Sequence, residues 1–246
     1  MKRLFDFSLS LIGLLALSPI LFGFIFIVWL QDLKSPFYVA PRVGKNMRIF
    51  RMVKLRSMVV NADQNGVDSK SSNDMRITTV GRIIRKCKLD ELTQLWNILI
   101  GDMSFVGPRP NVEREVALYT AEEQRLLCVR PGITDFSSIV FSDEGDILKG
   151  AKDPDLLYNQ LIRPWKSRLG LFCIEKSSFL CDLKVILLTV VAIFSRHKAL
   201  KGTHKLLKSL GADRQLLSVS LRNSVLLPHP PPGADLVVKS RSLDTI

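Results

Sequence analysis

The longest hydrophobic segment of the chain is an uncharged run from Leu9 to Leu30. A helix of this length can cross the hydrocarbon core of a bilayer. A cleaved signal peptide is a weaker interpretation, because the run is long for one and no small-x-small cleavage site follows it. The pattern therefore predicts a membrane helix within residues 1–34, and a straight span is its simplest form.

The residues around this run argue against one straight crossing. Basic residues precede it at positions 2–3 and follow it between positions 34 and 48, and positive charge is typical of the cytoplasmic side at each flank. Ser18 and Pro19 lie near its middle. Proline removes an N–H and kinks a helix, and a serine hydroxyl can bond the carbonyl that is freed. The alternative to a span is thus a re-entrant helix, broken at Ser18-Pro19, that returns to the same face.

The pattern after residue 34 predicts a mostly helical α/β domain. β-Branched and aromatic residues between 35 and 58 indicate one or two short strands, and helical spacing predicts helices over 76–88 and 90–100. Residues 153–196 are expected to be helical, and the apolar part at 180–194 is typical of a core helix or an interfacial amphipathic helix. From residue 199 to 246 the chain becomes basic and then proline-rich, which predicts a flexible tail. The expected organisation is a membrane helix at 1–34, a small domain at 35–198 and this tail.

Charge and histidine content narrow the chemistry. The formal net charge of +12 implies an anionic partner, and the hydrophobic N-terminus favours an acidic lipid surface or a phosphorylated substrate over nucleic acid. All three histidines lie at position 197 or later, so histidine-based nucleophilic mechanisms and histidine-ligated metals are poor hypotheses. The four cysteines show no CxxC spacing. Any acid, base or nucleophile is therefore expected to be a carboxylate.

The segment KLDELTQLWNILIGDMSFVGPRP, residues 88–110, concentrates the groups that could do this chemistry. Asp90 and Glu91 fall in the first turn of a predicted helix, where acids also serve as simple caps. Downstream, Pro108 and Pro110 fix the backbone on both sides of Arg109, so its guanidinium loses little entropy when it binds. A rigid arginine beside ionised carboxylates suits phosphate and a divalent metal.

Four further basic residues outside this segment are candidates for binding a substrate phosphate. Lys54 and Arg56 end the predicted strands and could simply form a solvated strand face. Arg85, shortly before the acidic pair, is interpreted as directed towards the substrate. Arg130 precedes a Pro-Gly turn and could equally mark the end of a helix.

Taken together, these motifs resemble the bacterial sugar transferases, the monotopic phosphoglycosyl transferases. The resemblance rests on the 88–110 segment, on KLRSM at 54–58, on RPGIT at 130–134 and on the Ser-Pro-interrupted hydrophobic N-terminus, and it covers roughly residues 1–198. Residues 135–150 depart from the commoner family form and resemble a subgroup with an acidic run. This departure bears on the identity of the sugar rather than on the reaction.

The resemblance implies a re-entrant membrane helix and a defined reaction. A sugar-1-phosphate would pass from a UDP-sugar to undecaprenyl (polyprenyl) phosphate, with release of UMP, by a ping-pong mechanism. Asp90 would form the covalent aspartyl-phosphosugar intermediate, and Asp90 and Glu91 would hold Mg²⁺. The substrate phosphates would be bound by the basic residues Lys54, Arg56, Arg85, Arg109 and Arg130.

The resemblance also implies a location and partners. The protein is expected at the bacterial inner membrane with its catalytic domain on the cytoplasmic face, where it would initiate an exopolysaccharide, capsule, O-antigen or glycoprotein glycan. Anionic membrane lipids are expected partners, and downstream glycosyltransferases and a second copy of the chain are further candidates. The alternative is a catalytically inactive scaffold in a glycan assembly complex, but the intact Asp-Glu pair and Pro-Arg-Pro loop argue against it.

Overall fold

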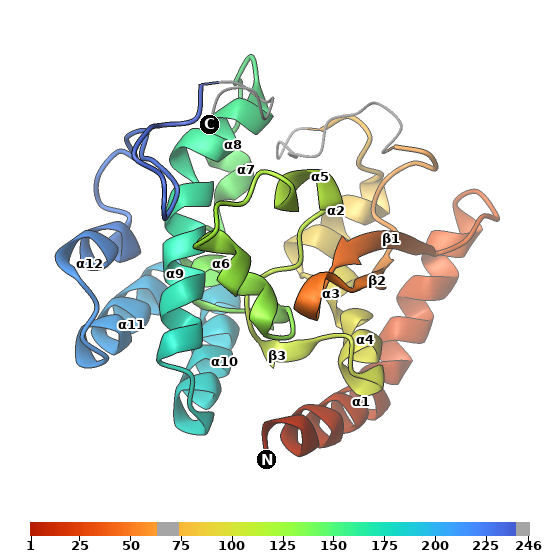
Figure 1. Ribbon diagram of the computed structural model, residues 1–246. Helices are drawn as coiled ribbons and strands as arrows, with labels where there is room; N and C mark the ends of the chain where they lie inside the picture. Colours follow the sequence, from red (N-terminus) through yellow and green to blue (C-terminus); the bar gives the residue numbers. More distant parts are fainter. Residues whose placement is uncertain (63–73, 240–246) are drawn as a thin grey trace.

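The structure is a computed structural model that describes residues 1–62 and 74–239. It is mostly helical with small two-stranded sheets and an N-terminal apolar helix, as predicted (Figure 1). The N-terminal half contains α1 (Lys2–Leu30), β1 (Phe37–Val43), the 3-10 helix η1 (Lys45–Met47), β2 (Ile49–Leu55), α2 (Thr79–Lys86), α3 (Leu89–Leu92), α4 (Gln94–Ile100) and β3 (Ser104–Val106).

Helix α1 is long and apolar enough to cross a membrane, and it continues through the proline at which a break was predicted. Pro19 has no N–H to donate to the carbonyl oxygen of Leu15, and the Ser18 hydroxyl donates to that oxygen instead at 2.8 Å. In Figure 1, α1 runs along the bottom of the molecule from the N-terminus and then up its right-hand side. The serine thus takes over the carbonyl freed by the proline, as expected, while the helix remains continuous.

The N-terminal end of α1 is bound to the rest of the protein by its polar residues. Lys2 Nζ forms an ion pair with the Asp182 carboxylate at 2.7 Å. Asp6 is buried and accepts hydrogen bonds from the Ser104 hydroxyl at 2.9 Å and from a β3 backbone N–H at 3.2 Å. Arg3 donates to two carbonyl oxygens in the last turn of α4 at 2.5 and 2.6 Å. A cation at this position complements the C-terminal end of the helix dipole.

The other end of α1 is bound just as firmly. The guanidinium of Arg56, at the end of β2, donates to both carboxylate oxygens of Asp32 at 2.5 and 2.6 Å and to the Val28 carbonyl oxygen at 3.4 Å. Arg56 is 8% exposed. Both ends of α1 are therefore attached to the same domain.

The two small sheets place the loops that follow them. Strands β1 and β2 pair antiparallel from Phe37 opposite Leu55 to Val43 opposite Ile49. Strand β3 pairs parallel with β4 (Gly132–Thr134). At this pairing a Cβ added to Gly132 would lie 2.2 Å from the Gly107 backbone nitrogen. The two backbone segments can therefore approach this closely only because residue 132 is a glycine. The loop after β3 is thereby held against the segment before β4.

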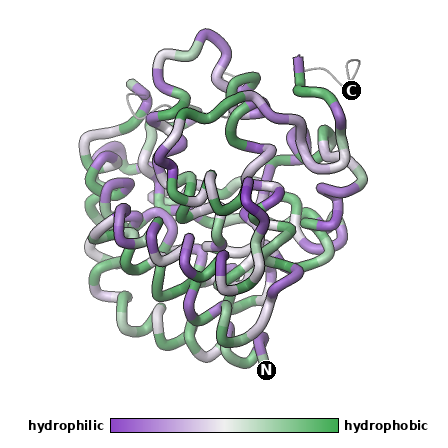
Figure 2. Tube along the Cα trace, turned by 90° about the vertical axis from the view of Figure 1, so that its left-hand side faces the viewer, coloured by the Kyte–Doolittle hydropathy of each residue, from purple (hydrophilic) through white to green (hydrophobic). Residues whose placement is uncertain are grey.

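The C-terminal half forms a helical layer around the largest hydrophobic core. Residues 153–196 are helical as predicted, in α8 (Pro154–Leu161), α9 (Arg163–Glu175) and α10 (Phe179–Phe194). Helix α10 buries Cys181 and Val185 but exposes Leu180, Leu187 and Phe194, as expected of an interfacial helix. Figure 2 shows hydrophobic segments gathered in the lower half of the molecule, towards the N-terminus. Between β3 and α8 lie, besides β4, the elements α5 (Glu113–Val116), the 3-10 helix η2 (Glu123–Cys128), α6 (Phe136–Val140) and α7 (Glu144–Ile147).

The segment from residue 199 differs from the flexible tail that was predicted, as far as it is described. Helices α11 (Arg196–Ser209) and α12 (Arg214–Leu221) pack on α10, α6 and α9, and Leu200, Leu207 and Leu216 belong to the main core. The chain then continues along α8 and α9, where the His229 ring lies 4.5 Å from the Trp165 ring. The leucines are spaced for a helix, but the surface that receives them comes from distant segments. Residues 240–246 lie outside the described residues.

Candidate active site

The predicted acidic pair lies on a helix of its own. The helix expected over 90–100 is divided at Thr93 into α3 and α4, and the Thr93 hydroxyl lies within hydrogen-bonding distance of the Val53 and Asp90 carbonyl oxygens, at 3.0 and 3.2 Å. Lys88 precedes α3 in the left-handed region, at φ 53° and ψ 27°. This conformation costs a non-glycine residue about 1 kcal/mol and makes the chain turn sharply before the acids. Asp90 and Glu91 are therefore presented on a single short turn packed against β2.

Arg109 holds one of the two carboxylates. It lies in the loop after β3, between Pro108 and Pro110, and its Nη2 forms an ion pair with Glu91 Oε1. The Arg109 side chain is 34% exposed and the Glu91 side chain 18% exposed. As predicted, a rigid arginine lies beside the acidic pair, and part of its surface remains accessible to a ligand.

The two neighbouring carboxylates differ in their proton affinity. Burial raises the pKa of Asp90, while the charges of Lys54, Arg109 and Arg85 act in the opposite direction. Burial also acts to raise the pKa of Glu91, but the Arg109 and Lys54 charges and the Arg109 hydrogen bond outweigh it and lower this pKa to about 2. Glu91 is thus ionised at neutral pH and paired with Arg109, while the environment of Asp90 disfavours its charge.

Two further predicted residues complete this cluster. Lys54 comes from β2, and its charge acts on both carboxylates. Arg85 comes from the last turn of α2 and donates from Nε to the Ser57 hydroxyl at 2.9 Å. Burial lowers the pKa of Arg85, and the charge of Asp90 acts to raise it. The structure therefore brings Lys54, Arg85 and Arg109 together around Asp90 and Glu91.

The structure does not bring Arg56 and Arg130 to this cluster. Arg56 is buried in its ion pair with Asp32 at the end of α1. Arg130 is exposed and donates from Nε to the Gly101 carbonyl oxygen at 2.8 Å. Both arginines were predicted to bind substrate phosphates; in the structure Arg56 binds Asp32 and Arg130 binds Gly101, partners that lie 24 and 29 residues away along the chain.

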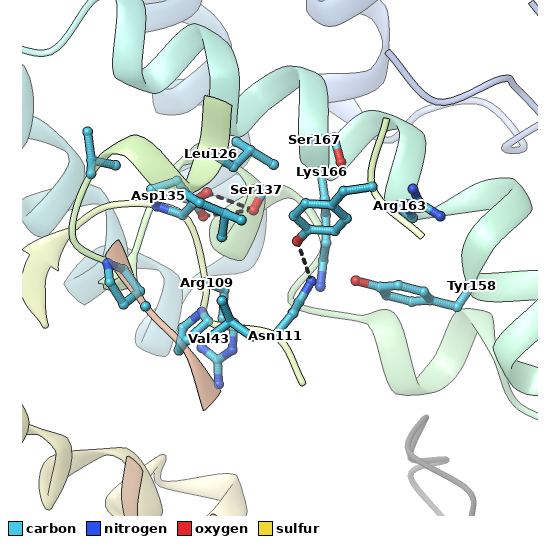
Figure 3. Close-up of a pocket in the computed structure, with 17 residues that line it drawn as sticks. Val43, Arg109, Asn111, Leu126, Asp135, Ser137, Tyr158, Arg163, Lys166 and Ser167 are labelled. Carbon is cyan, nitrogen blue, oxygen red and sulfur yellow. Dashed lines mark hydrogen bonds between the residues drawn. The ribbon is translucent and has the colours of Figure 1, made fainter. Parts of the chain in front are cut away.

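A cavity of about 50 Å³, lined by both polar and apolar residues, has Arg109 in its wall (Figure 3). The Asn111 side-chain amide donates to the Tyr119 hydroxyl at 2.8 Å at one wall, and Tyr158 and Lys166 lie at another. Tyr158 and Lys166 are not among the residues predicted from the sequence. They belong to α8 and α9, and no local motif marks them.

The acidic pair can contribute two of the ligands of a divalent metal. Among the described residues there is no group of three or more His, Cys, Asp or Glu side chains that could hold a metal alone. Mg²⁺ is commonly bound by one or two carboxylates together with substrate phosphates and water. Asp90 and Glu91 fit a site of that kind, which the substrate would complete.

Comparison with known proteins gives the family. The model of the family described as "Bacterial sugar transferase" matches residues 1–196. The chain is 33% identical over 180 residues to a UDP-N-acetylgalactosamine-undecaprenyl-phosphate N-acetylgalactosaminephosphotransferase of Aeromonas hydrophila, a match that covers 70% of this chain and 42% of the relative. It is 39% identical over 148 residues to the exopolysaccharide production protein ExoY of Sinorhizobium fredii, covering 54% and 66%, respectively.

A third relative is matched over most of its length. The uncharacterized sugar transferase EpsL of Bacillus subtilis is 34% identical over 190 residues, which cover 77% of this chain and 85% of the relative. The family match includes α1, the acidic pair and the Pro-Arg-Pro loop, and it ends at the start of α11. The chain belongs to the bacterial sugar transferase family.

Proposed function

We propose that this protein transfers a sugar-1-phosphate from a UDP-sugar to undecaprenyl phosphate, releases UMP and so initiates assembly of a bacterial polysaccharide. The observation that carries the proposal is the cluster of Asp90 and Glu91 with three cations from separate segments of the chain. The donor is a diphosphate, and its cleavage requires neutralisation of negative charge and an in-line nucleophile. The names of the Aeromonas and Sinorhizobium relatives, a sugar phosphotransferase and an exopolysaccharide production protein, agree with this reaction.

In the first step a carboxylate oxygen of Asp90 attacks the sugar-linked phosphorus. A new O–P bond forms, the bond from this phosphorus to the bridging oxygen breaks, and UMP leaves with the bonding electron pair. Asp90 is the better candidate than Glu91 because Glu91 is bound to Arg109, whereas burial makes the charge of Asp90 costly. When the donor binds next to Lys54 and Arg85, its phosphorus becomes the electrophile that the Asp90 carboxylate attacks.

In the second step a phosphate oxygen of the lipid attacks the same phosphorus. The bond to Asp90 breaks, the carboxylate is restored, and a polyprenyl-diphosphate sugar leaves. Arg109 and Lys54 remain near the transferred group in both steps and offset its charge. We further propose that Asp90 and Glu91 hold Mg²⁺ when the donor is bound; the ion would neutralise diphosphate charge there.

We also propose that α1 enters the cytoplasmic face of the inner membrane and returns to it. A straight helix of 29 residues would span about 43 Å, enough to place its two ends on opposite sides of a bilayer. Here Lys2 at one end binds Asp182, and Asp32 at the other end binds Arg56 of the same domain. A domain attached to both ends fits a helix that dips into one leaflet.

The experiment for the covalent step uses Asp90→Asn in the full-length protein. This variant is expected to lose UMP release and covalent labelling by UDP-sugars that carry label in the sugar, because an amide is a far weaker nucleophile. Glu113→Gln, at an exposed acid of α5, is the matched control and should retain both activities. If Asp90→Asn turns over at a rate close to that of the control, the proposed covalent intermediate is refuted. If the unmodified protein turns over no member of a panel of UDP-sugars, the alternative of an inactive scaffold is favoured.

A further inference from the structure

A second cavity, of about 230 Å³, lies apart from the acidic pair at the base of α1. Its walls come from the first turns of α1, from β3 and Gly107, from the segment before β4, and from the adjoining ends of α9 and α10. Asp90 and Glu91 are not among its lining residues. Four basic residues from three separate parts of the chain line it: Lys2, Arg3, Lys45 and Arg130.

The cavity has a surplus of positive charge. Of its two carboxylates, Asp182 is paired with Lys2, and Asp6 is buried with hydrogen bonds from Ser104 and from the backbone of β3. Arg3 and Arg130 donate to backbone carbonyl oxygens at the end of α4, which offer a partial negative charge but no carboxylate. A concave site with this balance favours an anion, and arginine is well suited to bind phosphate oxygens.

The surroundings of the cavity indicate where that anion comes from. The Phe5 ring of α1 packs edge-on against the Phe179 ring of α10 with centroids 5.1 Å apart, so these two helices meet beside the cavity. Both helices expose apolar side chains at this point, including Leu4 at 70% and Leu180 at 60%. Exposed apolar surface next to a basic hollow matches the arrangement of acyl chains and headgroup phosphate in a lipid.

We propose that this cavity binds the phosphate group of a membrane lipid whose chain lies along the exposed faces of α1 and α10. Arg130 and Lys45 would contact the phosphate, and Arg3 would add its charge. This assigns Arg130 to a lipid site and accounts for its distance from the acidic pair. Gly107 of the cavity wall is two residues from Arg109, so a bound lipid would touch the loop that holds Glu91.

Two lipids carry this chemistry, a bilayer phospholipid and a polyprenyl phosphate. If polyprenyl phosphate is the ligand, the cavity holds the acceptor before transfer, and this form of the proposal rests on the proposed function. The phospholipid version does not depend on it. Binding is therefore measured before activity.

The binding test compares Lys45→Gln/Arg130→Gln with Lys205→Gln/Lys208→Gln, which removes the same charge at exposed positions of α11 outside the cavity. Each full-length protein is titrated in neutral detergent micelles with dihexanoyl phosphatidic acid and, separately, with geranylgeranyl phosphate. Loss of two charge-assisted contacts is expected to weaken binding of at least one probe about tenfold or more. Lys45→Gln alone, on an exposed turn, should show part of this effect and guards against misfolding at Arg130.

The source of the phosphate follows from which probe responds. Weakened binding of geranylgeranyl phosphate together with a higher KM for the polyprenyl acceptor, at unchanged KM for the donor, identifies the acceptor. Weakened binding of phosphatidic acid alone identifies a bilayer lipid. Equal affinities of the cavity variant and the α11 variant for both probes would overturn the proposal, whatever the outcome for Asp90.

Discussion

Replacing Arg109 by glutamine separates the role of its charge from the rest of the site. The substitution leaves Glu91, 18% exposed, without its ion-pair partner while Lys54 and the remaining cations stay in place. It also removes the guanidinium that the proposed mechanism places next to the transferred phosphate. We therefore expect weaker catalysis and a change in how Glu91 titrates.

The size of the effect can be worked out from the geometry of the pair. Two unit charges about 4 Å apart attract by about 4 kcal/mol at an effective dielectric constant of about 20. Because the Arg109 side chain is 34% exposed, solvent screens part of this, and we use about half, ~2 kcal/mol. If the same charge stabilises the transition state to this extent, kcat/KM falls by about 30-fold. Arg109→Lys should recover part of the loss, because it keeps the charge without the planar fork.

The assay is UMP release from UDP-sugars in detergent micelles, with melting temperature against pH as a second readout. The pKa of Glu91 is about 2 in the folded protein against a usual 4.5, so its ionised form contributes stability above pH 4.5 that is lost as the pH falls towards 2. In Arg109→Gln this contribution should largely disappear. A variant with normal kcat/KM and an unchanged acid melting profile would refute the reasoning.

Three other predictions follow from buried charge and backbone geometry. Glu123→Gln breaks the fully buried ion pair with Arg163 and should cost about 3 kcal/mol of unfolding free energy, measured by denaturant titration, with kcat per folded molecule retained. Lys88→Gly relieves the left-handed conformation and should raise stability by up to about 1 kcal/mol in the same titration, whereas a loss would show that the lysine side chain matters more. Because burial raises the pKa of Asp90 and Lys54 opposes this, kcat/KM should fall on the acid side as Asp90 is protonated, and Lys54→Gln should move that fall to higher pH. An unmoved profile would exclude Lys54 as a charge partner.

Much of the candidate site could be predicted because its residues lie close together in sequence. The acidic pair, Arg85 and Arg109 fall within the 26 residues from Arg85 to Pro110, which contain a helix start and two prolines, and local rules apply to each. Lys54 reaches the site only because β2 packs against α3, and it was predicted through the family resemblance. The division of the expected helix at Thr93 could not be foreseen, because it depends on the Val53 carbonyl oxygen of β2.

The differences between the predictions and the structure share a physical cause. Arg56 looked like a substrate residue because its partner Asp32 lies beyond a whole strand hairpin. The C-terminal segment looked flexible because its charges and prolines dominate the composition, while the surface that buries Leu207 is formed by other helices. Patterns along the chain show which side chains are apolar or charged, but they do not show which distant segment will cover them.

The core shared by α10 and α11 has a practical consequence for anyone shortening this chain. The family match ends at residue 196, yet four leucines beyond it are buried against the rest of the protein: Leu200, Leu206, Leu207 and Leu216. Burial of each such side chain contributes about 1.5–3 kcal/mol to the free energy of unfolding, as an upper estimate. The four together are comparable to the whole free energy of unfolding of a typical domain, about 5–15 kcal/mol. A protein cut where the homology stops would uncover the apolar inner side of α10 to water. Soluble aggregates, rather than a minimal enzyme, are the foreseeable product.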